Sequence, residues 1–487
     1  MLSVMRLTAN FLMGLVILVP GCTLAHCEPL LPEPIQDPVI NLHKFTLKQA
    51  VYLTLKYNQS VESDSLGQEV NYWSVRSAYY GYEPQFNVSG SAAFVKGSQP
   101  TYALSPTATW TSLIGTTANF SYTPNFLQNV GTGNSSAGFG SLTVTQPLLN
   151  GFGVAFNSIA LKTAIYSYQT TNLAYKSSLI QAVNTTIVDF RQVVTSIHSL
   201  EDSRASVEAA KQQVKNTRLK LANDDPNTAP SDLVQMEQLQ ASSELNYLES
   251  RNQVETSYQT LLSDIGLPTS AVLHLDDRVD VSKSMIPNTE WAIRYAFAHN
   301  ISYLTQKIAV ESAKLTIISA RNAAKWTLTL SGNADIIGNT GVNAAGTQVG
   351  ILKNASATLA IPILNVTNHS AIVSAEIALA QAQITLASDK RALETRVRNE
   401  ITNATSRYEQ WNLAQAQVIL DRDTLRAAVI KQTYGQGSAF EVNRLQTTLL
   451  NDEIQMNNIG RSFQNSISDI NVTLGRMLDV WGVHLKY

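Results

Sequence analysis

The sequence predicts a mixed, mainly α-helical fold built from two tandem copies of one plan, in which β-strands lead into a very long helix. Two stretches of 72 residues, 154–225 and 363–434, contain neither Gly nor Pro. Each follows a segment that alternates apolar and polar residues. Each also begins at a similar junction, "TQPLLNGFG" (145–153) or "AIPILNVT" (360–367). An abrupt change from strand-like to helix-like texture therefore occurs twice.

The two copies align outside the junctions as well. "LKQAVYLTLKYNQS" (47–60) matches "TEWAIRYAFAHNIS" (289–302) at an offset of 242, which pairs Asn58 with Asn300. The junction prolines Pro147 and Pro362 are offset by only 215, so the first copy has 27 more residues between its strand-like ends. A fixed-offset match of this kind predicts two structural repeats. The predicted segments are a signal peptide (1–27), a Pro-rich segment (28–43), repeat 1 (44–268), an equatorial linker (269–288), repeat 2 (289–478) and a C-terminal tail (479–487).

The N-terminus predicts export. Arg6 precedes the apolar run from Phe11 to Val19, which is too short to span a bilayer and is typical of a secretory signal peptide. Both cysteines of the chain lie at its end, so the body that follows carries no disulfide framework. Cys22 is a candidate for lipidation after cleavage, although cleavage after Ala25 fits the sequence too.

The strands are predicted at about 84–148 in repeat 1 and about 325–362 in repeat 2. Trp326, Leu328 and Leu330 alternate with Thr and Ser, so one face is apolar and the other bears small hydroxyls. This is typical of a transmembrane β-barrel, although a soluble β-sandwich fits the same alternation. The chain after the signal peptide has no run of 18 apolar residues, so we expect no transmembrane helix.

The helices follow from heptad spacing. In repeat 2, apolar residues recur every seven positions along the Gly- and Pro-free stretch, for example Val397, Ala404, Trp411 and Val418, and this spacing favours a coiled coil. At 1.5 Å per residue such a helix is roughly 108 Å long. The predicted long helices span about 152–224 and 364–433, the tips 223–231 and 434–438, and the returning helices 231–266 and 438–475.

Closing a barrel requires more than one copy. We expect four strands per chain, and four strands cannot close a barrel, while an open edge is not tolerated in lipid. Two copies would give eight strands with a filled interior, whereas three would give twelve strands around a lumen. Pro147 and Pro362 then mark the junctions between barrel and helical tunnel, because proline ends strand pairing and suits a first helical turn.

These residues resemble the TolC-like outer-membrane efflux family. The two junction motifs and the tip "YGQGSAFEVNRLQTTLL" (434–450) carry the resemblance, which covers about residues 44–478. It implies a homotrimer in the outer membrane, with a 12-stranded β-barrel, four strands per protomer, continued by a 12-helix periplasmic α-barrel. It also implies a periplasmic adaptor and an inner-membrane pump or ABC exporter as partners. The 27 extra residues depart from the short first hairpin of some members of the family, and we expect them on the extracellular side.

The resemblance places the site residues at the tips. Asp232 and Glu441 match the acids near the narrow periplasmic end of the tunnel, while Arg444 replaces a second acid of the family. Ser438 and Glu441 also form a capping-box pattern, so helix capping is the alternative role for these acids. The contacts to the adaptor are expected at Asp224, Asp225, Gly435 and Gly437.

No catalytic or cofactor-binding signature occurs in the sequence, and its net charge of −2 gives no basis for nucleic-acid binding. We therefore expect a passive exit duct for efflux or type I secretion that is not an enzyme and uses no cofactor. The alternative is a periplasmic coiled-coil adaptor. An adaptor would show one helical hairpin flanked by small β-domains, not strands at two junctions.

Overall fold

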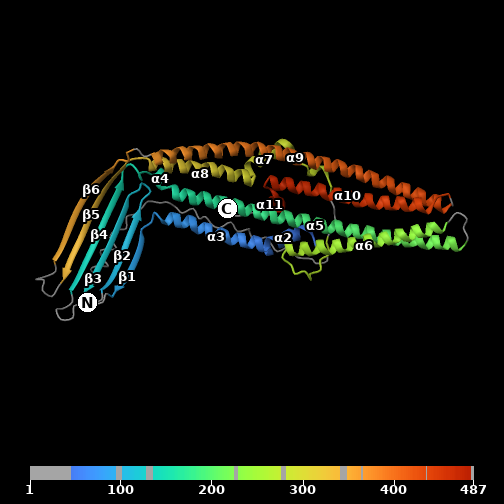
Figure 1. The fold of residues 1–487 in the computed structure, drawn as a ribbon, viewed down its shortest axis with the longest axis horizontal. Helices are drawn as coiled ribbons and strands as arrows, with labels where there is room; N and C mark the ends of the chain where they lie inside the picture. Colours follow the sequence, from blue (N-terminus) through green and yellow to red (C-terminus); the bar gives the residue numbers. More distant parts are fainter. Residues whose placement is uncertain are drawn as a thin grey trace.

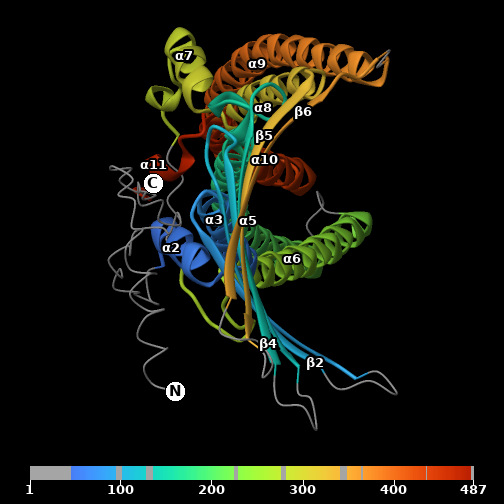
Figure 2. The same cartoon turned by 90° about the vertical axis from the view of Figure 1, so that its left-hand side faces the viewer.

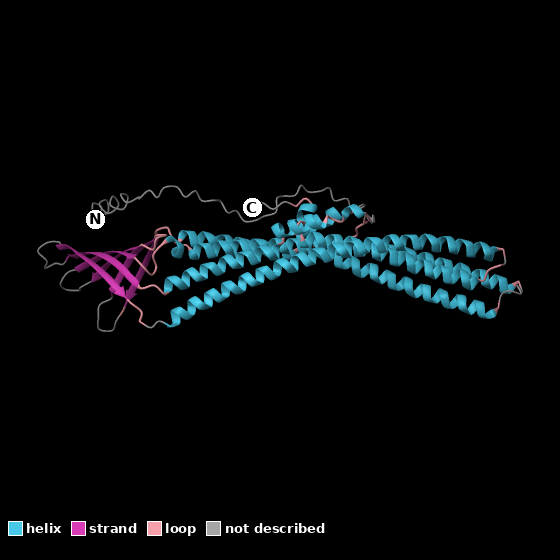
Figure 3. Cartoon of the chain, turned by 90° about the horizontal axis from the view of Figure 1, so that it is seen from above, coloured by secondary structure: helices cyan, strands magenta, loops and turns pink. Residues whose placement is uncertain are grey.

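The structure is a computed structural model that describes residues 45–94, 101–127, 135–223, 229–275, 281–340, 348–363, 366–434 and 436–483. Several predictions concern residues outside these ranges: the signal peptide 1–27 with Cys22, the Pro-rich segment 28–43, Asp224, Asp225 and Gly435. The described residues are mainly helical and include an antiparallel sheet, as predicted. The sheet lies at one end of an elongated molecule and the helix tips lie at the other (Figures 1 and 3).

The first half of the chain runs from two short helices into the sheet and back out along one long helix. Asn58 both ends α2 and begins α3, where its side chain accepts hydrogen bonds from the amides of Ser60 and Val61. The elements are α2 (Leu47–Tyr57), α3 (Gln59–Tyr80), β1 (Gln85–Ala93), β2 (Thr101–Thr111), β3 (Thr117–Leu127), β4 (Ser135–Pro147), α4 (Val154–Asn157), α5 (Ile159–Ala222) and α6 (Pro230–Asp264).

The second half has the same order with a shorter strand region. Asn300 separates α7 from α8 and accepts a hydrogen bond from the amide of Tyr303, as Asn58 does at the corresponding point of the first half. The elements are the 3₁₀ turn η1 (Lys283–Met285), α7 (Thr289–His299), α8 (Ile301–Ala323), β5 (Thr327–Thr340), β6 (Gln348–Ala360), α9 (Val366–Thr433), α10 (Ala439–Thr473) and α11 (Met477–Val480).

The sheet corrects the expectation of four strands per chain. All its neighbours are antiparallel, and among the described residues it has six strands in the order β1-β2-β3-β4-β5-β6. Repeat 1 contributes four strands and repeat 2 contributes two. The physical reason is that the extra residues of repeat 1 do not form one long loop. They turn back at residues 112–116, where the amide of Ser112 donates to the carbonyl oxygen of Thr116 over 2.8 Å, and so form a further hairpin.

Four helices lie side by side at every level along the molecule. Beside the sheet the contacts run α3 to α5, α5 to α8 and α8 to α9. Towards the tips, α6 replaces α3 and α10 replaces α8, so the order becomes α6, α5, α10, α9. Figure 2 shows these helices forming a curved layer behind the sheet. α5 and α9 therefore run the length of the helical part. Beside them, α3 and α6 lie end to end, and so do α8 and α10.

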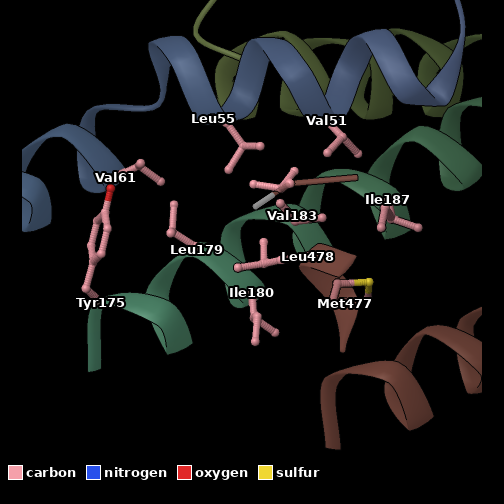
Figure 4. Close-up of a cluster of buried hydrophobic side chains, with 11 residues drawn as sticks. Val51, Leu55, Val61, Tyr175, Leu179, Ile180, Val183, Ile187, Met477 and Leu478 are labelled. Atoms are coloured by element: carbon pink, nitrogen blue, oxygen red, sulfur yellow. The ribbon is translucent and has the colours of Figure 1, made fainter. Parts of the chain in front are cut away.

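The core lies midway along the helices. α2 lays Val51 and Leu55 across α5, where Leu179 and Val183 are fully buried, and α11 closes the cluster with Leu478 (Figure 4). Burying a side chain of this kind contributes about 1.5–3 kcal/mol. Similar clusters join α2 to the end of α6, and α7 to α9 and α10. The short helices α2, α7 and α11 thus pack against the long helices at the level where α6 takes the place of α3, and α10 takes the place of α8.

The same backbone contact recurs in both halves at this level. The Asn58 side chain donates to the carbonyl oxygen of Asp264 over 3.1 Å, and Asn300 donates to that of Thr473 over 2.9 Å. Beside each, a glycine with positive φ ends the returning helix: Gly266 has φ +71° and Gly475 has φ +70°. A Cβ at Gly266 would lie 2.6 Å from the Tyr57 carbonyl oxygen, and one at Gly475 would lie 2.5 Å from the corresponding oxygen of His299.

One helix differs from the sequence expectation about membrane spans. α9 contains an 18-residue window with a mean hydropathy of 1.3, so it could cross a membrane by length and composition alone. Only 6% of that window is buried within the chain. The rule of consecutive apolar residues missed it because Glu and Gln interrupt an Ala-, Ile- and Leu-rich segment. At 68 residues, α9 is far longer than the roughly 20 residues that a bilayer requires.

Candidate functional site at the helix tips

The first tip residue, Asp232, is used to start a helix. Pro230 is the first residue of α6, where its missing N–H has no partner to lose. The Asp232 carboxylate accepts a hydrogen bond from the Ala229 amide at 2.9 Å. It also lies in the first helical turn, where a negative charge is favourable. One carboxylate oxygen of Asp232 is therefore already engaged by its own backbone.

Glu441 has a freer carboxylate. The Ser438 hydroxyl accepts a hydrogen bond from the Glu441 amide at 3.2 Å, so Ser438 caps α10. Within the part of the chain that the structure describes, the Glu441 side chain makes no hydrogen bond or ion pair, and neither does that of Arg444. Both side chains are exposed. The structure thus places a negative and a positive charge three residues apart on α10 without pairing them.

The structure brings the two tips together. Met236, one turn beyond Asp232, is 2% exposed and accepts a hydrogen bond at its sulfur from the side-chain amide of Asn443. Asn443 and Val442 are buried at the same contact. Asp232 and Glu441 therefore lie near the starts of α6 and α10, which contact each other within their first two turns. Figure 1 shows both helices beginning at the end of the molecule far from the sheet. Sequence reasoning missed the Met236–Asn443 contact, because no pattern in either segment links the two halves.

Among the described residues, an ion pair joins the two helices of each helical hairpin. Arg218 of α5 lies 2.9 Å from Glu237 of α6, and Arg422 of α9 lies 2.6 Å from Glu453 of α10. Both arginines are well exposed, so each pair contributes only about 0–1 kcal/mol. They orient the hairpins more than they stabilise them.

Two pairs of acidic side chains involve α10, one with α5 of the first hairpin and one with α9 of its own hairpin. Burial and the nearby Glu453 carboxylate raise the pKa of Asp202 on α5. A hydrogen bond with Asp421 of α9 raises the pKa of Asp452 on α10. His198 and Arg422 partly offset the rise in the pKa of Asp202. Asp202 lies at the seam between the hairpins, α5 against α10, whereas Asp421 and Asp452 lie within the second hairpin.

Both predicted junction prolines lie where the sheet meets the helices, but their surroundings differ. Pro147 ends β4 opposite Thr329 and is half-buried. The loop after it is held by Asn322, which is 2% exposed and donates to the Asn150 side chain over 2.9 Å. Pro362, in contrast, is the second residue after the end of β6 and is exposed in the single chain. The first junction is thus a loop held by side-chain hydrogen bonds, whereas the proline of the second junction is exposed.

The last predicted tip residue within the described residues is Gly437. A Cβ at this position would lie 3.0 Å from the amide nitrogen of Gln432 in the last turn of α9. The turn between α9 and α10 is therefore tight, and a larger residue at Gly437 would widen it. No group of three or more His, Cys, Asp or Glu side chains able to hold a metal ion occurs among the described residues.

The fold and the placing of the tips define a class: the chain has the fold of bacterial outer-membrane channels. No family model matches the sequence, and no curated protein matches it either. Solved structures match along most of the chain. The outer membrane protein VceC from Vibrio cholerae has 13% identity and a TM-score of 0.66, covering 88% of this chain and 96% of VceC.

Two further channels show the same likeness. The open state of the MtrE outer membrane channel of Neisseria gonorrhoeae has 13% identity and a TM-score of 0.66 over 89% of both chains. The CmeC outer membrane channel of Campylobacter jejuni has 15% identity and a TM-score of 0.62, over 88% of this chain and 85% of CmeC. The predicted resemblance is therefore confirmed at the level of the fold.

Proposed function

We propose that this chain is one of three identical subunits of an outer-membrane channel that serves as a passive exit duct for tripartite efflux or type I secretion. In this proposal the sheets of the subunits form a barrel in the outer membrane, and the helices form a tunnel through the periplasm. An inner-membrane pump or ABC exporter supplies the energy, and a periplasmic adaptor contacts the tips. The tunnel catalyses no reaction and uses no cofactor.

The observation that carries the proposal is the open sheet. Among the described residues, β1 and β6 each pair on one side only, so the sheet of one chain has two unpaired edges. Unpaired strand edges are not tolerated in lipid, and a closed barrel removes them. Copies of the chain that pair β6 of one with β1 of the next satisfy both edges at once. Such head-to-tail contacts generate a ring when the rotation closes.

The helices at the same two edges support a ring of copies. α3 leads into β1 and exposes Leu66, Val70 and Trp73, which are spaced to lie along one helical face. α9 follows β6 and exposes an apolar series of its own, represented by Ile377 and Ile384. Burying these two series against each other would cover the apolar surface that each chain leaves exposed.

The dimensions also agree with this role. With 64 residues in α5 and 68 in α9, the helices are about 96 and 102 Å long at 1.5 Å per residue. The adaptor alternative is less well supported, because six adjacent strands with one apolar face are not required of a helical spacer. Asp232, Glu441 and Arg444 are then proposed to line the periplasmic mouth, and Gly437 to form part of the adaptor contact.

The test is the mass and conductance of the protein after extraction from outer membranes with detergent. We expect a particle of three protomers that opens ion-conducting channels in planar lipid bilayers. A monomer in detergent, or recovery in the soluble periplasmic fraction, would refute the proposal. The intact mass of the same sample also distinguishes an acylated Cys22 from a start after Ala25.

A further inference from the structure

The four strands of the first half raise the question of how many strands line the pore. The second half inserts one hairpin, β5–β6, between α8 and α9, whereas the first half inserts two hairpins between α3 and α5. The additional hairpin could stand outside the barrel as a flap, or it could form part of the wall. Three properties of the structure bear on this choice.

The first property is the pattern of the two sheet faces. A row of polar residues crosses all six strands: Gln85, Thr109, Asn119, Thr143, Asn333 and Asn354 are successive partners. The next row, on the opposite face, is apolar until the edge strand: Phe86, Ala108, Phe120, Leu142, Ala334 and Lys353. β1 and β2 therefore present the same two faces as β3 to β6. A hairpin outside the barrel would be surrounded by water, so we would not expect it to continue the apolar face of the other strands in register.

The second property is the anchoring of the β2–β3 turn. Gly115 in this turn has φ +96°, and a Cβ there would collide with the carbonyl oxygen of Gly151 in the first junction. The Gly153 amide donates to the Ile114 carbonyl oxygen over 3.1 Å. Beside it, the Trp110 indole donates to the carbonyl oxygen of Tyr82 over 3.1 Å. The turn is thus built into the loop that leads to α4 and α5, and the hairpin cannot swing away without breaking that loop.

The third property is width. Strands 4.8 Å apart that are tilted by about 40° span roughly 38 Å when there are six of them, and roughly 25 Å when there are four. Four helices side by side at about 9 Å span roughly 36 Å. The strands are inclined to the long helices in Figure 1. Six strands therefore match the arc of the four helices on which they stand, and four strands would be narrower.

We propose that all six strands line the pore, so that three copies close an 18-stranded barrel in which β6 of one copy pairs with β1 of the next. This inference rests on the proposed function for the membrane setting and the number of copies. A barrel of 18 such strands has a backbone diameter of about 36 Å, against about 24 Å for 12 strands. The membrane segment would then be wider than a 12-stranded one and would restrict passing solutes less.

Disulfide cross-linking tests which strand meets β6 of the neighbouring copy. A Cys27→Ser background is suitable, because Cys22 is either acylated or removed with the signal peptide. In one set, Ser89→Cys on β1 is combined in turn with Asn354→Cys, Ser356→Cys and Thr358→Cys on β6. In the other set, Ser121→Cys on β3 is combined with the same three changes. All of these positions lie on the polar face, and three β6 positions allow for the shear of a closed barrel.

We expect oxidation to link β1 to β6 between copies, giving dimers and trimers in SDS without reductant, and to leave the β3 set unlinked. Links from β3 and none from β1 would overturn the inference, since they mean a 12-stranded wall with the first hairpin outside. A double variant, Thr107→Cys with Ser121→Cys, joins paired residues of β2 and β3 and is the internal control for oxidation. If this control forms its disulfide while neither the β1 set nor the β3 set gives cross-links between copies, β1 does not pair with β6 of the neighbouring copy. The inference is then also overturned.

The mass of the uncross-linked particle separates this outcome from failure of the proposed function. A trimer in which β3 is cross-linked to β6 is consistent with the proposed channel and refutes only the 18-stranded barrel. A monomer refutes the channel itself. A particle of two copies with β1 links would close a 12-stranded barrel and would overturn the trimer and the 18-stranded count together.

Discussion

The two acids at the tips differ in how much of their charge is available to a passing ion. Asp232 accepts a hydrogen bond from the Ala229 amide. The Glu441 carboxylate, in contrast, is exposed, and the start of α10 is capped by Ser438. In a ring of three copies, Glu441 would place three like charges around one axis. Narrow walls of low dielectric constant focus such a field, which attracts cations and repels anions.

We expect Glu441→Gln to lower the preference for cations over anions severalfold in planar bilayers, with no change in the mass of the particle. Arg444→Ala should raise that preference, because it removes a cation three residues away on the same helix. Asp232→Asn, which retains a capping side chain, is the matched control and should have the smaller effect. Unchanged ion preference in Glu441→Gln would mean that this residue only helps to begin α10.

A second residue-level feature is a carboxylate pair midway along the molecule. Burial, together with a hydrogen bond to Asp264 and its charge, raises the pKa of Asp189 from an ordinary value of 3.8 to about 7. An acid whose pKa rises on folding holds its proton more tightly in the folded state. Its contribution to stability is therefore present at acid pH and is lost as the pH rises from about 4 through 7.

Asp189→Asn should consequently raise the midpoint of thermal unfolding by a few degrees at pH 8 and much less at pH 5, where the native acid is already protonated. Circular dichroism of the detergent-solubilised protein measures both midpoints. Asp423→Asn, at a well-exposed acid of α9, is the control and should not show this difference. Equal shifts of the midpoint at both pH values for Asp189→Asn would contradict the assignment.

At the level of elements, the contact that recurs at the end of α6 and of α10 fastens each short helix to a returning one. Gly475 combines a positive φ with a Cβ position 2.5 Å from the His299 carbonyl oxygen. A non-glycine residue in this conformation costs about 1–2 kcal/mol before any collision. The collision adds to this, because the atom that a Cβ would meet is backbone and cannot rotate away.

Gly475→Ala should therefore lower the temperature at which the oligomer dissociates in SDS, and Gly266→Ala should do so comparably. Gly482→Ala is the matched control, since Gly482 has φ +71° but no atom within 4 Å of the Cβ position. The difference between Gly475→Ala and Gly482→Ala isolates the close approach, and we expect it to exceed about 1 kcal/mol in the free energy of unfolding. Similar losses of stability in Gly475→Ala and Gly482→Ala would mean that the positive φ alone accounts for the need for glycine at position 475.

The elements also indicate how far the sequence predicts the fold. The stretch without Gly or Pro at 363–434 corresponds to α9, and several residues of its predicted heptad series, Val397, Ala404 and Val418, are buried. The hairpin formed by β2 and β3 was not predicted. Each of these strands contains a proline, Pro106 or Pro124, and proline normally argues against an interior strand because it donates no hydrogen bond.

The candidate site was predictable only in part. Asp232, Glu441 and Arg444 were predicted from the family resemblance, and the start of each returning helix could be recognised from its capping pattern. The partner of Met236 and the neighbours of Asp202 come from the other half of the chain. Such contacts depend on how α5 packs against α10, and no local pattern encodes that packing.

At the scale of the whole molecule, the apolar surface of one chain is left incomplete along the two edges of its curved layer. α3 exposes Leu66 and Val70 beside β1, and α9 exposes Ile377 and Ile384 beside β6. Exposed apolar series of this length are unusual for a protein that functions as a monomer. In the proposed ring the same neighbour covers the strand edge and the helix edge, so the sheet and the tunnel close together.

The up-and-down order of the sheet has a consequence for the widths that such a pore can adopt in evolution. Every strand carries the chain from one rim of the sheet to the other, and both α3 and α5 connect to the same rim. A single added strand would deliver α5 to the opposite rim, away from the helices with which it packs. Only whole hairpins can therefore be inserted, and a ring of three copies widens in steps of six strands.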